Sequence, residues 1–417
     1  MLNSYLKQVI GVVVIISAFL TGCSSDNTVT PPGNSTVNGK IVDSEGAGVG
    51  GVSVWIDSNI ATSNFDGTFS ISNIEAPYNV KVVLDDPPNS LGYLFEDVST
   101  FSPVLTVDKS GSPFQGTFNI TLPPMLANQT ARVSVVTDNV FENAITVPFP
   151  STNTILGVEW ISANEVNAKI YVLVYTMAGG EIVSYEKYGE KDTTITAGST
   201  INYTFSNSEL SLDPVEAQIS GNIVLPGGYI IPNASLFLSF SQGSLNVPSL
   251  GNTVLNSTFN FVVPTGLTTS PRLGVRAGAS TSEGHFTTNN FNLLAGSTNN
   301  TLNLNAAPNL GSPLENATGV NLNTDFSYSG GSGTGMYKVR LSTTGKVLYV
   351  ITNNTTFRIP DFSPFGLNYT AGQTYNWYLY KYYSIGSVND YVSTSEITNS
   401  AFTGVSLSNG RSFTSGN

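Results

Sequence analysis

The stretch VSVWIDSNIATSNFDGTF, residues 52–69, decides the fold class of this chain. Every second residue from Val52 to Ile56 is apolar, which is the period of a half-buried β-strand. Asp66-Gly67 follows, and glycine accepts the positive φ that a tight hairpin turn requires. Alternation resumes directly after this turn. We therefore expect strands joined by tight turns in this part of the chain.

The composition extends this expectation to the whole chain. Of its 417 residues, 40% are hydrophobic and only 11% are charged, and it contains 19 Tyr and 22 Phe. Aromatic and β-branched residues favour strands, whereas helices are usually rich in Ala, Leu, Glu and Lys. No amphipathic helical pattern is evident after residue 23. The sequence predicts an all-β protein built from tandem β-sandwich domains.

The opening stretch belongs to a longer series of short motifs. These are GKIVD at residues 39–43, VSV at residues 52–54 and TSNFDGTF at residues 62–69. The series resembles the carboxypeptidase regulatory-like family, whose members are small transthyretin-like β-sandwiches. The usual Pro-Leu before the second motif is Gly-Gly here, at residues 50–51. The resemblance implies a sandwich that continues through GTFNITLPP and ends near Pro124.

A second copy of this unit is expected later in the chain. Gly221 follows Gly39, and Leu236 follows Val54, by the same number of residues. STFNFVVPTG mirrors GTFSISNIEA, RLGVRA mirrors NVKVVL, and NTLNLNAAP mirrors GTFNITLPP. The Asp-Gly turn has no counterpart in this copy. The echoes predict an internal repeat.

The C-terminal part carries a different pattern. Its motif residues are Tyr337, Leu367, the YNW of residues 375–377 and the FT of residues 413–414. This pattern resembles a fibronectin type III-like domain, with Tyr328 in place of the usual early tryptophan. The resemblance implies that these residues pack in the core of a second kind of β-sandwich.

The intervening segment, residues 129–212, is rich in strands, and its sequence does not decide which family it belongs to. A hairpin is expected around Gly179-Gly180. YVLVYTMAGGEIV echoes YKVRLSTTGKVLY of the C-terminal part, and AGSTINY echoes AGQTYNW. These echoes predict two rounds of one sandwich followed by another, with chance similarity among β sequences as the alternative.

The N-terminus carries a sorting signal. An apolar run from Val9 to Leu20 follows Lys7, and it is too short for a confident spanning helix. Leu20-Thr21-Gly22-Cys23 follows, and it resembles the lipobox of bacterial lipoproteins. The resemblance implies that the Cys23 sulfur receives a diacylglyceryl group and that cleavage makes Cys23 the first mature residue.

Lipidation would give the chain a durable membrane anchor, because each buried lipid CH₂ contributes about 0.8 kcal/mol. Ser24, in place of an Asp, favours the outer membrane of a bacterial envelope. The alternative is an uncleaved N-terminal anchor with an incidental cysteine.

The patterns divide the chain into six segments. They are a signal peptide (residues 1–22), a polar linker (23–36), a regulatory-like β-sandwich (37–124), a β-sandwich of uncertain family (129–212), a second regulatory-like β-sandwich (215–308) and a fibronectin type III-like β-sandwich (309–417).

Several kinds of chemistry lack the residues they need. Once Cys23 is lipidated, no thiol remains for a disulfide, a metal or a nucleophile, and His285 is the single histidine. No G-x-S-x-G motif or calcium-loop pattern occurs. The net charge of −12, with only 16 Lys and Arg, disfavours nucleic acid as a partner. We therefore predict a non-enzyme without cofactor or metal, and an unrecognised carboxylate site is the remaining enzymatic alternative.

The segment YNWYLYKYY contains the best candidate for a ligand surface. Alternation places Tyr375 and Trp377 on the core face and Tyr378, Tyr380 and Tyr382 on the other. Tyrosine rings on an outer face could stack on sugars or pack on another protein. Cross-strand packing inside the domain is the structural alternative.

Two functions remain open from the sequence. The first is a non-catalytic envelope lipoprotein that acts as an adhesive, scaffolding or accessory module. Its partners would be the membrane, through the lipid anchor, and an envelope protein or polysaccharide. The second is a surface lipoprotein that binds carbohydrate through the tyrosine row.

Overall fold

The computed structural model describes most of the chain. The described residues are 35–44, 46–86, 89–108, 114–137, 142–160, 163–230, 233–239, 244–247, 257–267, 272–383, 385–393 and 404–416. The Val9–Leu20 run and the expected lipobox, Leu20 to Cys23, lie outside these residues. The described part is almost entirely β, which confirms the predicted fold class.

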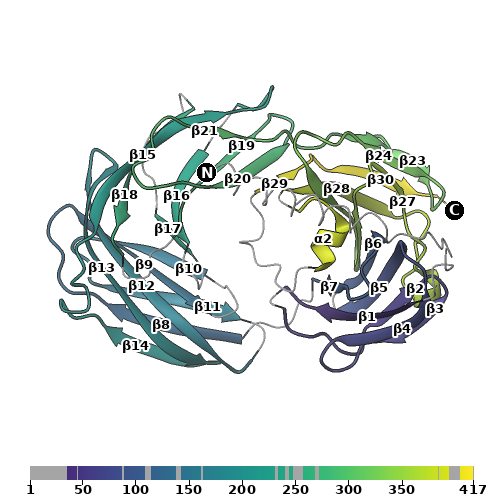
Figure 1. The fold of residues 1–417 in the computed structure, drawn as a ribbon, viewed down its shortest axis with the longest axis horizontal. Helices are drawn as coiled ribbons and strands as arrows, with labels where there is room; N and C mark the ends of the chain where they lie inside the picture. The colour runs from purple at the N-terminus through teal and green to yellow at the C-terminus, as the bar shows by residue number, and fades with distance from the viewer. Residues whose placement is uncertain are drawn as a thin grey trace, which may run out of the picture.

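The opening stretch of sequence lies in the first of four β-sandwiches (Figure 1). One sheet has the order β4-β1-β7 and the other contains β3-β2-β5-β6. The strands are β1 (Ser35–Val42), β2 (Ser53–Ile56), β3 (Asn59–Thr62), β4 (Thr68–Ile74), β5 (Tyr78–Asp86), β6 (Asn89–Val98) and β7 (Val104–Thr106). β1 pairs antiparallel with β4 and parallel with β7.

The expected repeat is present as the third sandwich. β15 pairs antiparallel with β18 and parallel with β21, as β1 does with β4 and β7. Gly221 lies opposite Phe259 in this copy, and Gly39 lies opposite Phe69 in the first. The strands are β15 (Val215–Val224), β16 (Asn233–Ser239), β17 (Ser244–Val247), β18 (Thr258–Thr265), β19 (Arg272–Ser280), β20 (Phe286–Asn292) and β21 (Asn300–Asn303).

The second sandwich has this topology as well, which the sequence did not predict. β8 pairs antiparallel with β11 and parallel with β14, and the opposite sheet has the order β10-β9-β12-β13. The expected hairpin around Gly179-Gly180 joins β12 to β13. The strands are β8 (Phe114–Thr121), β9 (Gln129–Thr137), β10 (Glu142–Pro148), β11 (Asn153–Trp160), β12 (Glu165–Ala178), β13 (Glu181–Thr196) and β14 (Thr200–Thr204).

This arrangement corrects the assignment of GTFNITLPP. The segment was expected to close the first sandwich, but its strand β8 opens the second, and Phe118 and Ile120 lie in the core there. The three-residue β7 closes the first sandwich instead. The expected order of two sandwiches repeated as a pair is therefore wrong: three sandwiches share one topology and a different one follows.

The fourth sandwich packs the sheet β22-β24-β27 on β25, β26, β28 and their neighbours. The residues singled out by the fibronectin-like pattern, Tyr328, Tyr337, Leu367, Tyr375, Trp377 and Phe413, are buried in its core. The elements are β22 (Leu310–Ser312), β23 (Ala317–Val320), β24 (Asp325–Tyr328), β25 (Gly335–Thr343), β26 (Lys346–Thr352), β27 (Thr356–Arg358), η1 (Ser363–Phe365), β28 (Thr374–Tyr383), α2 (Val388–Ser393), β29 (Gly404–Leu407) and β30 (Arg411–Ser415).

One sheet runs through the first, third and fourth sandwiches. Its path is β17-β16-β19-β20-β29-β28-β25-β26-β6-β5-β2-β3. β20 joins the fourth sandwich through antiparallel pairing with β29, and β26 joins the first through parallel pairing with β6. Figure 1 shows the result, in which the first sandwich lies beside the fourth although the second and third separate them in sequence.

The joint between the first and fourth sandwiches is a shared core. β26 alternates between two clusters: Tyr349 and Ile351 pack in the first sandwich, while Leu348 and Val350 pack in the fourth. α2, which no helical pattern predicted, places Tyr391 and its apolar neighbours in the first core as well. The fourth sandwich therefore supplies part of the hydrophobic interior of the first.

Candidate binding surface

The tyrosine row lies on one face of the shared sheet. Tyr375 and Trp377 are buried in the fourth core, and Tyr378, Tyr380 and Tyr382 occupy the opposite face, where each is half-buried. This is the alternation that the sequence predicted for β28. The tyrosine row therefore lies outside the core of the fourth sandwich. The residues packed against the row determine how much of its ring surface a ligand could contact.

Packing within the protein occupies both ends of the row. Tyr378 accepts a hydrogen bond from the guanidinium of Arg340 on β25, and its ring meets Tyr380 edge-to-face at 5.5 Å. Tyr382 packs against the core of the first sandwich. Cross-strand packing inside the domain therefore accounts for much of Tyr378, while Tyr382 packs partly on another sandwich, and Tyr380 lies between them.

A hollow opens beside Tyr380 and Tyr382, where β28 and β29 meet β20 and β19. It encloses about 560 Å³, and we call it the junction hollow. Its lining includes Arg276, Phe286, Asn290, Tyr380, Tyr382 and Val405. The strand registers place these side chains on one face, because Tyr380 and Phe286 both lie opposite Leu407. Sequence patterns found the tyrosines but missed Arg276 and Asn290, which reach them only through the pairing of the two sandwiches.

Two neighbours hold the guanidinium of Arg276 in place. Its Nε donates to Oδ1 of Asn290 over 2.9 Å, and its Cζ lies 5.9 Å from the ring centre of Phe237. The ring of Phe237 lies directly against Gly274, where any Cβ would come within 2.2 Å of it. Gly274 thus leaves room for Phe237, which in turn supports the cation.

The reverse face of β28 is tied to the same junction by Lys381. This lysine is buried, and its Nζ donates to the carbonyl oxygens of Gly330, Ser332 and Gly333. Burial lowers the pKa of its ammonium group. Three backbone acceptors replace the water that the charge loses, so Lys381 fixes the loop before β25 rather than facing a ligand.

His285 fastens the third sandwich to the fourth. Its Nδ1 accepts the backbone N–H of Asn409 over 3.3 Å, and its Nε2 lies 3.9 Å from Glu283. Burial lowers the pKa of its imidazole, with a further lowering from Arg411, while Glu283 acts in the opposite direction. His285 lies directly before β20, which begins at Phe286.

We expect acid to weaken this joint. The folded protein favours neutral His285, so its contribution is present above the ordinary pKa of about 6.5 and is lost as the pH falls below that value. Loss of the acceptor should cost about 1 kcal/mol. Denaturant unfolding at pH 7.5 and pH 5.0 measures the loss, and His285→Asn, which keeps an acceptor but cannot titrate, should show a smaller loss. An identical loss in both proteins would contradict this role.

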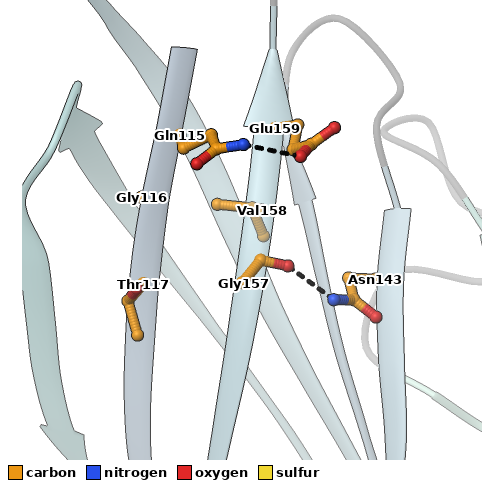
Figure 2. A pocket seen from close by; sticks show the side chains of 7 residues that line it. All are labelled: Gln115, Gly116, Thr117, Asn143, Gly157, Val158 and Glu159. Carbon is orange, nitrogen blue, oxygen red and sulfur yellow. Dashed lines mark hydrogen bonds between the residues drawn. The ribbon is translucent and has the colours of Figure 1, made fainter. Parts of the chain in front are cut away.

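A second hollow lies on the second sandwich (Figure 2). Gln115 Nε2 donates to Glu159 over 2.9 Å on one side, and Asn143 donates to the carbonyl oxygen of Gly157 on the other. Nothing lies within 4 Å of a Cβ placed on Gly157, so the glycine leaves this strand surface open. Its polar groups already bind one another, and the junction hollow is the better candidate site.

The described residues lack two features that are typical of other functions. These residues contain no group of three or more His, Cys, Asp or Glu side chains that could hold a metal ion. None of their helices has the length and apolarity needed to cross a bilayer.

Comparison with known proteins adds little to this picture. No protein-family model and no curated protein sequence matches the chain. The fimbrial anchor protein Mfa2 of Porphyromonas gingivalis is 10% identical, and the match covers 39% of this chain and 77% of Mfa2 with a TM-score of 0.16. A Ca²⁺-stabilized adhesin with which an Antarctic bacterium binds ice is 11% identical over 89% and 96% of the two chains, also with a TM-score of 0.16. At such low TM-scores, these likenesses carry no functional argument.

Proposed function

We propose that this chain is a non-catalytic lipoprotein of a bacterial cell envelope that serves as an adhesive, scaffolding or accessory binding module. The observation that carries this proposal is the sheet shared by three sandwiches. Paired strands at both joints hold those sandwiches in fixed relative positions. A body of this kind can present a surface to a partner without any moving part.

The membrane anchor in this proposal rests on the sequence Leu20-Thr21-Gly22-Cys23. Thioether-linked lipid at Cys23 would tether the body to the membrane, and Ser24 favours the outer membrane. Two or more acyl chains are enough for stable anchoring.

We expect metabolic labelling with an alkyne analogue of palmitate to mark the wild-type protein and to fail with Cys23→Ser. Ser24→Ala is the matched control, because it alters the neighbouring position and leaves the thiol in place. Mass spectrometry of the mature N-terminus should find Cys23 first and lipidated. A bare thiol behind an intact N-terminal segment would overturn the anchor.

A second candidate function is carbohydrate binding through the tyrosine row. The junction hollow supports it, because Tyr380, Tyr382 and Phe286 lie beside the donors of Arg276 and Asn290. Small-ligand sites commonly combine aromatic walls with a few placed polar groups. A glycan array comparing the wild type with a variant carrying alanine at Tyr378, Tyr380 and Tyr382 tests it, and equal binding by the two proteins would reject it.

A further inference from the structure

We propose that the junction hollow binds an acidic saccharide, with Arg276 receiving a sugar carboxylate and Tyr380 presenting its ring to the sugar. The inference rests on the second candidate function and names the ligand class for that surface. Three observations carry it: the charge of the lining, the fixed position of the guanidinium, and the aromatic side chains around it.

The charge of the lining favours an anion. Arg276 is the one charged residue among the described residues that line the hollow, and no Asp or Glu is among them. The chain as a whole carries a net charge of −12, whereas no acidic side chain is among the described residues that line this hollow beside Arg276. A guanidinium presents a planar pair of N–H donors that matches a carboxylate.

Arg276 is exposed to solvent, and its guanidinium contacts two neighbouring side chains in the absence of any ligand. Asn290 accepts from Nε, which is the nitrogen nearest the strand, and Phe237 lies beneath the planar group. Neither terminal nitrogen makes a hydrogen bond to another described residue. A donor group whose direction is fixed in advance loses less conformational entropy on binding.

The neighbouring rings favour a sugar over a simple carboxylate. On the β20 side of the hollow, Phe286 is 38% exposed. On the β28 side, the rings of Tyr380 and Tyr382 are stacked with their centres 6.1 Å apart. Burial raises the pKa of Tyr380 to about 12, so its phenol stays neutral at physiological pH. Rings beside a cation offer apolar faces for the C–H side of a pyranose. The volume of about 560 Å³ lies within the usual range for small-ligand sites, roughly 300–1,000 Å³.

Matched oligosaccharides test the proposal on the purified full-length protein. The primary pair is β-1,4-linked trimannuronic acid and β-1,4-mannotriose, which differ only in carrying a carboxylate or a hydroxymethyl group. Galacturonic and glucuronic acid oligomers, each with its neutral counterpart, complete the panel. Calorimetry should show binding of at least one acidic member at least ten-fold tighter than its neutral partner, and added salt should weaken it.

Arg276→Gln should abolish this preference by weakening the acidic sugar at least ten-fold. Arg272→Gln on the same strand is the matched control and should leave the affinity unchanged; unchanged melting temperatures establish that both variants are folded.

Equal binding of acidic and neutral sugars would overturn the acidic assignment but keep carbohydrate binding. Absence of binding across the panel would overturn the proposal, and the glycan array then decides the second candidate function separately. If Arg276→Gln and Arg272→Gln weaken binding of the acidic sugar equally, the binding site is not the junction hollow.

Discussion

Replacing Ile351 with aspartate should separate the first sandwich from the fourth and cost about 4 kcal/mol or more of unfolding free energy. Ile351 is only 1% exposed, and it lies on the side of β26 that fills the core of the first sandwich. A carboxylate there would lie among apolar side chains, and the isoleucine contacts would be lost as well. Hydrogen exchange should show faster exchange at β6, which pairs with β26.

Ile155→Asp provides the matched control for this change. Ile155 also lies on a strand, but it is 69% exposed on β11. The same chemical substitution there should change the unfolding free energy by no more than about 0.5 kcal/mol. If the two variants unfold alike, or if β6 keeps its protection in Ile351→Asp, the shared core does not hold the two sandwiches together.

Replacing Trp377 with alanine should lower the unfolding free energy by about 3–5 kcal/mol. The indole is fully buried at the centre of the fourth sandwich, where its ring meets Phe326 edge-on at 5.1 Å. Alanine would leave a cavity among large aromatic side chains that cannot collapse into it. Denaturant unfolding, monitored through circular dichroism, measures the loss.

Trp377→Phe should cost much less than the alanine change. Phenylalanine keeps most of the ring contacts, and the indole Nε1 that it removes has no hydrogen-bond partner among the described residues. Removing a buried unsatisfied donor offsets part of the lost volume. A phenylalanine variant as unstable as the alanine variant would contradict the expectation that ring contacts kept by phenylalanine stabilise this core.

Local patterns in the sequence predicted individual strands and the internal repeat. Alternation from Val52 to Ile56 identified β2, and the spacing of Gly221 and Leu236 identified the repeat in the third sandwich. Both signals come from one face of a strand packing on one core. The resemblance to a fibronectin type III-like domain implied the buried positions of Tyr337 and Trp377.

The strand that closes the first sandwich was harder to find. β7 has only three residues, so it leaves almost no periodic signal between Val104 and Thr106. The longer and more regular β8 therefore took its place in the prediction, and the shared topology of the second sandwich was missed. Pairing between distant strands, rather than the pattern within one strand, decides such cases.

The candidate site, too, was predicted only in part from local sequence patterns. The tyrosines were evident because three of them alternate along one strand, β28. No sequence pattern around Arg276 predicts a binding site. Arg276 lines the same hollow as Tyr380 only because β20 pairs with β29. The helix α2 was missed because six residues are too few to display a helical period.

The parallel pair of β6 and β26 has a consequence for biosynthesis. Ribosomes make β6 long before β26, and the second and third sandwiches are completed in between. Until then, a nascent β6 has an unpaired edge, and the interior that Tyr349 and Ile351 will fill remains open. Exposed strand edges promote association with other chains. The core of the first sandwich therefore cannot be completed before β26 has been made, and a holding chaperone would be most useful during that interval.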